Sequence, residues 1–313
     1  MSALLFPGQG SQVVGMGLEF YKNFNVVKEI FNQADSKLNY SISKMILEGP
    51  EDQLQLTKNT QPAILTVSYS IFKVLRDEFN FNTNSFNYFA GHSLGEYSAL
   101  VCANSLNFED ALFLLHERGK AMQEAVPMGK GSMVAVLGTE IEKINEIITS
   151  LKKDSGVCEI ANDNAVGQII ISGDKNKVAS FQSILKQKKI KTIPLKVSAP
   201  FHCSLMKPAA KNMEEKINNT IFKNLSHEII NNVTASAENN PEKIKKLLID
   251  QIFSTVKWRE SLKKMSDKGV SNFIEIGPGK VLNGMVKRTL TNAKSFSINS
   301  IADIKNFINE FKK

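Results

Sequence analysis

One short stretch, residues 91–95 with the sequence GHSLG, constrains strongly what this chain can fold into. It has the form Gly-x-Ser-x-Gly and lies between an aromatic-rich run, residues 86–89, and a segment of small and apolar helix formers. At the end of a strand this pattern makes a sharp turn into a helix, because glycines permit a tight backbone and leave the serine oxygen exposed above the sheet. A plain turn with a solvated serine would carry the same five letters. The flanking segments favour the sharp turn, hereafter the nucleophile elbow, and make Ser93 the first candidate nucleophile.

Length and composition set the outer limits of the fold. The 313 residues are 42% hydrophobic, which is enough for one large core, or for one core and a smaller domain. No run of about 18 apolar residues occurs, so no transmembrane helix is expected. The N-terminus lacks a basic segment and runs from an apolar stretch into Pro7 and Gly8, so it is interpreted as a first strand without a signal peptide.

Three widely spaced cysteines and a net charge of +8 bear on compartment and partners. An odd number of cysteines at such spacing argues against a disulfide framework or a zinc cluster and fits a reducing cytoplasm. The positive charge is compatible with nucleic acid, a coenzyme phosphate or an acidic carrier protein as partner. Because the lysines are scattered among acidic residues, a solvated surface is the default interpretation and a nucleic-acid surface the weaker one.

A glycine-rich loop, residues 7–12, follows the expected first strand, residues 3–6. Such a loop is typical of dinucleotide sites, but glycines at positions 8, 10 and 15 miss the Gly-x-Gly-x-x-Gly spacing. What remains is a loop able to present backbone N–H groups. Beside a nucleophile these groups would supply half of an oxyanion hole, and the N–H of Leu94, the residue after the serine, would supply the other half.

A helix capped by Asn107 carries an apolar stripe that contains one charged residue, Arg118. An arginine on an apolar face keeps its charge, so it needs an anion or must reach the rim of the protein. Spacing alone supports a structural salt bridge with a buried carboxylate about as well as a role in ligand binding. Only four of the 39 basic residues are arginines, which favours a site that needs the planar, bidentate guanidinium group. A substrate carboxylate is the anion that this group binds best. The stripe consists of Ala111, Leu114, Leu115, Ala121, Met122 and Ala125.

Residues 127–197 alternate in the order β-α-β-β-α-β, the signature of a ferredoxin-like unit. About 70 residues suffice for a self-contained inserted domain. We therefore expect an α/β fold in which residues 1–126 and 198–313 form a hydrolase-like larger domain with a mostly parallel sheet, and residues 127–197 a ferredoxin-like insert. Within the insert, strands are expected at 132–137, 157–161, 168–172 and 191–197, helices at 140–153 and 174–188, and a turn at 162–167.

Outside the insert, the hydrophobic periodicity predicts continued alternation of helices and strands. Helices are expected at 21–38, 61–79, 208–220 and 301–311, and one long amphipathic helical region at 242–265. Strands are expected at 228–234, 272–276 and 295–298.

A catalytic base would have to come from one of four histidines. His202 follows a proline-stiffened exit from the insert, where a cleft between the two domains would form, and it comes after the serine in chain order. It is therefore the best candidate, although a lone histidine in a loop is more often structural. Of the other three, His92 is expected to point away from Ser93 and His116 to lie at the surface, whereas His227 has no distinguishing context. Two acids are possible triad members without a signal of their own, Asp250 and Glu275.

Five motifs occur in the order seen in malonyl-CoA:acyl carrier protein transacylases, which the chain resembles over nearly its whole length. Each motif alone is moderately specific, whereas five in register would rarely arise by chance. The motifs are FPGQGSQ at 6–12, GHSLGEY at 91–97, RG at 118–119, APFH at 199–202 and EIGPG at 275–279.

The resemblance implies roles for particular residues. Ser93 would be the acylated nucleophile and His202 its base. In this family a backbone carbonyl orients the histidine, and the matching position here is Gln251, which would explain the missing triad acid. Arg118 would hold the malonyl carboxylate. The oxyanion hole would be formed by the backbone N–H groups of Gln9 and Leu94.

Two further positions concern the acyl pocket. Phe201, directly before the histidine, resembles the version that goes with an unbranched malonyl group. Asn162 lies where the family's pocket wall is expected and is assigned to substrate binding, with Asn164 in the same neighbourhood. Residues 164–167, NAVG, depart from the proline-containing version that is common after the family's asparagine.

As to function, the resemblance implies a ping-pong acyltransferase that moves a malonyl group from malonyl-CoA to the phosphopantetheine thiol of acyl carrier protein, for fatty acid synthesis. No metal or bound cofactor would be needed. A cytoplasmic monomer is expected, with neither nucleic acid nor a membrane as partner. A discrete transacylase of polyketide synthesis would carry the same motifs. An acyl-thioester hydrolase and a carrier-docking module with a vestigial site are weaker alternatives, because the lipase His-Gly-Gly-Gly motif is absent while serine, histidine and arginine are all present.

Overall fold

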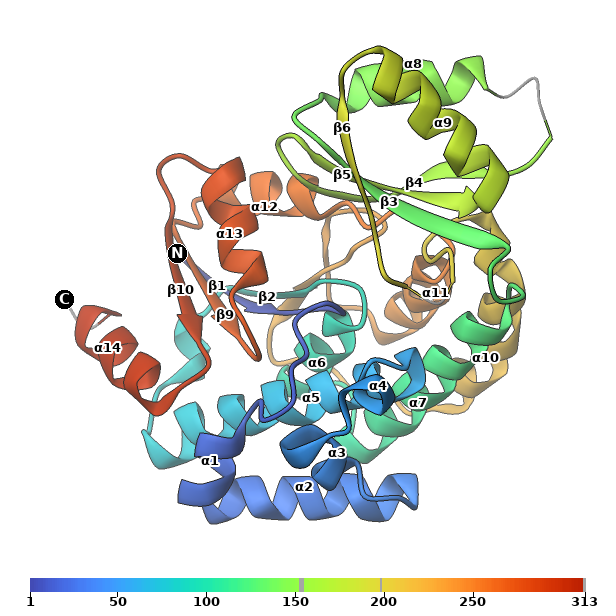
Figure 1. The fold of residues 1–313 in the computed structure, drawn as a ribbon. Coiled ribbons are helices and arrows are strands. Elements are labelled where there is room, and N and C mark those ends of the chain that lie inside the picture. Colours follow the sequence, from blue (N-terminus) through green and yellow to red (C-terminus); the bar gives the residue numbers. More distant parts are fainter. Residues whose placement is uncertain (152–154, 198, 312–313) are drawn as a thin grey trace.

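Two sheets organise the chain, of which the computed structural model describes residues 1–151, 155–197 and 199–311 (Figure 1). The larger sheet has the strand order β10-β9-β1-β2-β7-β8. Its neighbouring strands run parallel except β7 and β8, which pair antiparallel. The predicted α/β class with a mostly parallel sheet is therefore confirmed. The strands are β1 (Ser2–Phe6), β2 (Tyr88–Gly91), β7 (Glu228–Ile230), β8 (Ala237–Glu238), β9 (Asn272–Ile276) and β10 (Lys294–Ile298).

Strand β1, in the middle of this sheet, shows why helices cover both faces. Successive side chains of a strand point to opposite sides. Leu4 and Phe6 accordingly belong to one hydrophobic cluster, and Ala3 and Leu5 to another. All four are fully buried, which is the pattern of a parallel sheet enclosed on both faces.

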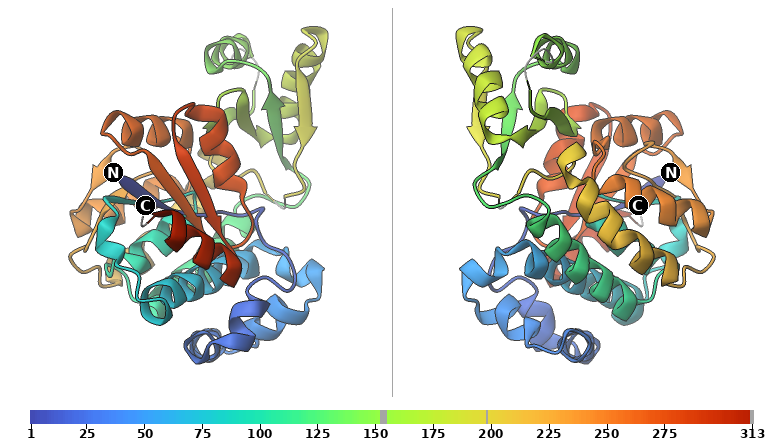
Figure 2. Two further views of the ribbon diagram at one scale, coloured as in Figure 1. Left: turned by 90° about the vertical axis from the view of Figure 1, so that its left-hand side faces the viewer. Right: turned by 90° about the vertical axis from the view of Figure 1, so that its right-hand side faces the viewer.

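The helices lie in two layers around this sheet (Figure 2). One face is packed against α12 (Trp258–Asp267) and α13 (Val281–Thr289). The other face carries α5 (Thr57–Lys73) and α6 (Gly95–Cys102), with α2 (Asn25–Leu38) and α7 (Phe108–Glu124) beyond them. No helix among the described residues is long and apolar enough to cross a membrane. The remaining helices of this larger unit are α1 (Leu18–Asn23), α3 (Ile42–Glu48), α4 (Glu51–Leu54), α10 (Lys207–Asn219), α11 (Pro241–Gln251) and α14 (Ile301–Phe311).

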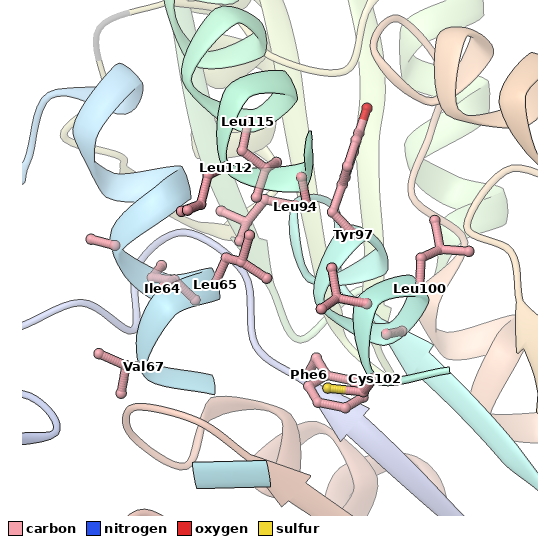
Figure 3. Packing of buried hydrophobic residues seen from close by; sticks show 14 of the residues in the cluster. Phe6, Ile64, Leu65, Val67, Leu94, Tyr97, Leu100, Cys102, Leu112 and Leu115 are labelled. Carbon is pink, nitrogen blue, oxygen red and sulfur yellow. The ribbon is translucent and has the colours of Figure 1, made fainter. Parts of the chain in front are cut away.

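Helix α6 follows the nucleophile elbow directly and is buried along its whole length. Figure 3 shows Leu94, at its start, among Leu65 of α5 and Leu112 and Leu115 of α7. The predicted cap of α7 is also present, because the Asn107 side chain accepts a hydrogen bond from the backbone N–H of Glu109 at 3.1 Å. The elbow therefore rests on a helix that the core holds from all sides.

The smaller sheet is antiparallel and has the strand order β4-β5-β3-β6. Its two helices pack on one face only, and the β-α-β-β-α-β order predicted for a ferredoxin-like unit is confirmed. Along β3, Val134 and Val136 face these helices, whereas Met133 and Ala135 face the larger core. The domain boundaries at 127 and 197 stay a prediction. The elements are β3 (Gly131–Leu137), α8 (Ile141–Ser150), β4 (Cys158–Ala165), β5 (Gln168–Asp174), α9 (Lys175–Gln187) and β6 (Lys191–Pro194).

One turn prediction in the insert is wrong. The segment 162–167 was expected to be a turn because it is rich in turn formers, yet β4 continues through Ala165 and leaves only residues 166–167 to turn. Asn162 and Asp163 pair with β5 across irregular register, and Asn162 also bridges to Val256 of the larger unit. Pairing on both sides outweighs the local turn preference.

Two helix predictions are also corrected. The helical region expected at 242–265 contains two helices, α11 and α12, because Val256 between them pairs with Asn162 inside β4. The helix expected at 21–38 is divided at Phe24, whose backbone is extended and whose ring packs on Phe20 and Phe79. Hydrophobic periodicity continued across both breaks, so it did not reveal them. The end of the expected helix 140–153 and Ser198, the expected start of the returning larger domain, lie outside the described residues.

The close approach of β1 and α6 generates a stability prediction. A Cβ added to Gly95 would lie 2.3 Å from the carbonyl oxygen of Phe6 and 2.8 Å from that of Pro7, and neither backbone atom can move aside. Gly95→Ala should therefore lower the free energy of unfolding by on the order of 3 kcal/mol in urea titrations. Gly284→Ala in α13 is the control, because a Cβ there meets nothing within 4 Å and should stabilise the helix by up to about 1 kcal/mol. Equal stability of the two variants would contradict this packing.

Candidate active site

The nucleophile elbow has the strained backbone that its sequence predicts. Strand β2 ends at Gly91, α6 begins at Gly95, and Ser93 between them has φ 52°. A left-handed conformation costs a non-glycine residue about 1–2 kcal/mol, so the surrounding structure must hold it. A Cβ on Gly91 would lie 1.9 Å from the carbonyl of Gly95, which explains why glycine is needed there. The turn projects the Ser93 side chain toward the smaller sheet.

The Ser93 hydroxyl lies 2.7 Å from Nε2 of His202. The other ring nitrogen of His202, Nδ1, lies 2.9 Å from the backbone carbonyl oxygen of Gln251. A carbonyl oxygen only accepts hydrogen bonds, so Nδ1 carries the proton and donates it. Nε2 is then left with a lone pair, and the Ser93 hydroxyl donates to it. The imidazole is thus oriented as a base toward the serine.

Burial keeps His202 uncharged. The side chain is almost completely enclosed, and desolvation, with the nearby positive charge of Arg118 as the second cause, lowers the pKa of His202 from 6.5 to about 3. The histidine is therefore neutral at pH 7. Its lone pair is available for proton transfer across the whole physiological range.

Arg118 is buried at the other side of the serine, with 1% of its surface exposed. Its guanidinium donates to the Ser93 hydroxyl at 3.1 Å and to two amide oxygens, those of Gln61 at 2.8 Å and Gln251 at 2.9 Å. In the part of the chain that the structure describes, no carboxylate forms an ion pair with Arg118, and its Nε–H has no partner. Neutral amides hold the guanidinium in place without cancelling its charge, so the site favours an anionic ligand.

A cavity of about 240 Å³ opens between the two sheets in front of these groups. Ser93, His202 and Arg118 line it, and much of the remaining lining is apolar, including Met133 and Ile170 of the smaller sheet. Four other residues assigned from the sequence also line the cavity, whereas Gln251 lies behind it and touches His202 and Arg118. The four residues are Gln9, Leu94, Asn162 and Phe201.

In the described part of the chain, the remaining histidines and the two acids considered for a triad make no hydrogen bond to Ser93 or His202, although His92 also lines the cavity. His92 turns to Asn164, with its Nε2 at 2.8 Å from the amide oxygen. His116, expected at the surface, is half-buried beside the Lys58 carbonyl oxygen. His227 stacks on Phe89. Among the described residues, neither Asp250 nor Glu275, the two acids considered for a triad, contacts His202. Glu275 instead accepts hydrogen bonds from backbone N–H groups at the start of α13.

Sequence reasoning missed a buried polar network behind the elbow. Glu96 accepts from the backbone N–H of Asn232 at 3.1 Å, the side chain of Asn231 at 2.5 Å and the side chain of Gln251 at 2.8 Å. Gln61 was missed as well, although a glutamine on an otherwise buried helix is a signal. Glu96 lies in the GHSLGEY motif at 91–97, but its position there predicts only a residue in the first turn of a helix.

The fold and the geometry define a class of protein: an α/β protein in which a serine hydroxyl, a neutral imidazole and a buried guanidinium meet at one cavity, an arrangement suited to acyl transfer through a serine. Comparison with known families identifies it further. The acyl transferase domain family matches residues 3–311. The chain belongs to this family.

Individual relatives carry a more specific name. The chain is 40% identical to the malonyl CoA-acyl carrier protein transacylase of Bacillus subtilis over 312 residues, covering 99% of this chain and 97% of that one. It is similar to the crystal structure of an acyl-carrier-protein-S-malonyltransferase from Bartonella henselae, with a TM-score of 0.96, 38% identity and coverage of 100% and 99%. A malonyl-transacylase in complex with a holo type II PKS acyl-carrier protein superposes with a TM-score of 0.95 at 36% identity, covering 99% of both chains.

The buried carboxyl group of Glu96 generates a pH prediction. Burial raises the pKa of Glu96 from 4.5 to about 7, although its three donors act in the opposite direction. The folded protein therefore binds this proton more tightly than the unfolded chain, so the stabilisation is full below pH 4.5 and is lost as the pH rises through 7. The unfolding free energy of the natural chain minus that of Glu96→Gln should fall by on the order of 3 kcal/mol between pH 4.5 and 8. If the difference in unfolding free energy between the two proteins stays constant with pH, the raised pKa of Glu96 is contradicted.

Proposed function

We propose that this chain transfers the malonyl group of malonyl-CoA to the phosphopantetheine thiol of acyl carrier protein through a malonyl ester on Ser93. The observation that carries the proposal is the buried guanidinium of Arg118, which contacts the nucleophile and has only neutral partners. A substrate whose acyl group bears its own carboxylate would supply the missing anion. The names of the relatives at 40% identity and the carrier complex of a structural relative support this choice of substrate and partner.

The first half-reaction acylates the enzyme. As the Ser93 hydroxyl passes its proton to Nε2 of His202, its oxygen attacks the thioester carbonyl carbon of malonyl-CoA. The resulting oxyanion would be held by the backbone N–H groups of Gln9 and Leu94, both at the cavity wall. When the carbon–sulfur bond breaks, the imidazolium returns the proton to the departing CoA sulfur. The Gln251 carbonyl keeps the ring oriented throughout.

The second half-reaction moves the acyl group to the carrier. His202 accepts the proton of the phosphopantetheine thiol, and the sulfur attacks the malonyl-Ser93 ester. The carbon–oxygen bond to Ser93 breaks, and the proton passes from His202 to the serine oxygen. Both steps use groups of the chain and its two substrates, and phosphopantetheine belongs to the carrier. Three free, buried cysteines are compatible with a reducing cytoplasm, where we place this reaction as a supply step of fatty acid synthesis.

Malonyl selectivity would come from Arg118 in two ways. A malonyl carboxylate would pair with the guanidinium, whereas an acetyl group would leave the charge buried and unpaired, at a cost of about 1–3 kcal/mol. The carboxylate would also draw Arg118 away from the Ser93 hydroxyl and offset the positive charge that lowers the pKa of His202. Phe201 and Asn162 would shape the wall around the acyl group, with Phe201 limiting branching.

Intact-mass measurement tests the proposed reaction. Mixing the protein with malonyl-CoA should give an adduct of one malonyl group, and adding holo acyl carrier protein should move that group to the carrier. Ser93→Ala should form no adduct, which is the control for labelling elsewhere. Release of CoA and malonate without carrier acylation would instead identify a thioester hydrolase. Absence of any adduct on the natural chain would overturn the proposal.

The role of Arg118 is tested by comparing two acyl groups. Arg118→Ala should lower kcat/KM for malonyl-CoA on the order of 100-fold, equivalent to about 3 kcal/mol, and leave transfer from acetyl-CoA within about threefold. Arg118→Lys keeps the charge and loses the planar fork, so it should recover only part of the malonyl activity. Equal losses for malonyl and acetyl groups in Arg118→Ala would show that the guanidinium does not recognise the carboxylate.

A further inference from the structure

Asn232 holds the nucleophile elbow from the side opposite the cavity. Its side-chain oxygen accepts from the backbone N–H of Ser93 at 2.7 Å, and its side-chain nitrogen donates to the carbonyl oxygen of Gly91, also at 2.7 Å. The pairing of β2 with β7 ends at Ala90 and Ile230. Beyond this pair, the side-chain amide of Asn232 replaces the backbone pairing of the strands, because it bonds to both the Ser93 N–H and the Gly91 carbonyl.

The amide of Asn232 is fixed in one orientation. The Gly91 carbonyl only accepts, so the nitrogen must face it, and the oxygen then faces the Ser93 N–H and, at 3.3 Å, the side-chain nitrogen of Gln251. Its backbone is anchored as well, because its N–H donates to Glu96 and its carbonyl accepts from the N–H of Lys257. Asn232 is fully buried, so water does not replace these bonds.

We propose that Asn232 is a positioning residue that maintains the reactive, left-handed conformation of Ser93. It touches neither the cavity nor the serine hydroxyl, and it acts through the backbone on both sides of that residue. The hydroxyl stays 2.7 Å from His202 and 3.1 Å from Arg118 only while the strained turn is held. This inference rests on the proposed function for the identity of the acyl donor and on the geometry alone for the role of the residue.

Asn232→Ala removes both clamping bonds and should misplace the nucleophile. In single-turnover experiments with malonyl-CoA, the maximal rate of Ser93 acylation should fall roughly 10–100-fold, because the loss acts on the reacting atom. The malonyl-CoA concentration at half-maximal rate should change less than about threefold, since Arg118 keeps Gln61 and Gln251 as partners. Asn59→Ala is the matched control: Asn59 is buried to a similar degree and bonds to Gln53 and Tyr40 outside the cavity. It should acylate within about twofold of the natural rate.

Asn232→Asp gives a signature that a general loss of stability does not. Its carboxylate would still accept from the Ser93 N–H, but its second oxygen would repel the Gly91 carbonyl until a proton binds and restores the donor. The ratio of its acylation rate to that of the natural chain should therefore rise at least about fivefold as the pH falls from 8 to 5. This arm also decides the matter if Asn232→Ala fails to fold.

A serine-directed fluorophosphonate separates this inference from the proposed function. The probe reacts with an activated serine and needs no malonyl recognition, so its labelling rate should follow the same order: natural chain and Asn59→Ala fast, Asn232→Ala slow, Asn232→Asp faster at low pH. If malonyl-CoA does not acylate Ser93 while the labelling rates keep this order, the proposed substrate is wrong and the role of Asn232 stands. The positioning role would be overturned by any of three results. Asn232→Ala could be labelled as fast as the natural chain, Asn59→Ala could lose as much rate as Asn232→Ala, or the rate of Asn232→Asp relative to the natural chain could stay constant with pH.

Discussion

The buried positive charge of Arg118 is the interaction on which the arrangement of the site depends. A guanidinium cannot readily shed its proton, so a protein that encloses it must supply hydrogen-bond acceptors. Here the acceptors are two amide oxygens and the Ser93 hydroxyl. Amides satisfy geometry and leave the charge available, whereas a carboxylate at the same position would have neutralised it. The same charge contributes to the low pKa of His202, so one side chain acts on the histidine as well as on the serine that it contacts.

Gln251 connects these requirements in a single residue. Its backbone carbonyl sets the tautomer of His202, its side-chain oxygen accepts from Arg118, and its side-chain nitrogen reaches the Ser93 carbonyl and Glu96. A third catalytic acid is unnecessary for orientation, because a carbonyl fixes the imidazole as well as a carboxylate would. The carbonyl adds no negative charge. It therefore orients the imidazole without pairing a carboxylate with Arg118.

The cavity exists because two sheets with different coverage meet. The smaller sheet has helices on one face only, and its other face, with Met133 and Ile170, closes over the elbow. The larger sheet contributes the serine at the carboxyl end of a central strand, where open α/β sheets present their reactive groups. His202, also left-handed at φ 57°, arrives on the segment that returns from the smaller sheet. Both units thus line the cavity: the larger sheet brings Ser93, and the smaller sheet brings Met133 and Ile170 together with Asn162.

Much of this could be predicted from local rules, and the exceptions share a cause. The elbow, the apolar stripe around Arg118 and the β-α-β-β-α-β order depend on short-range spacing, so the sequence alone predicts them. The turn expected at 162–167 was wrong, and the helical region expected at 242–265 is interrupted, because Val256 pairs with Asn162, a contact between distant segments. Glu96 and Asn232 carry no local pattern that separates them from ordinary polar residues, and Gln61 is marked only by its place on a largely buried helix.

The sequence by itself determined which chemical groups are present and the strained turn that exposes one of them. Glycines at 91 and 95 permit a close-packed elbow, and an arginine on an apolar stripe needs an anion or must reach the rim of the protein. Only the tertiary structure decided whether a protein carboxylate pairs with Arg118, because the answer depends on which side chains from distant helices reach the guanidinium. Those side chains are Gln61 and Gln251, both neutral. Long-range packing therefore surrounds this charge with neutral hydrogen-bond partners.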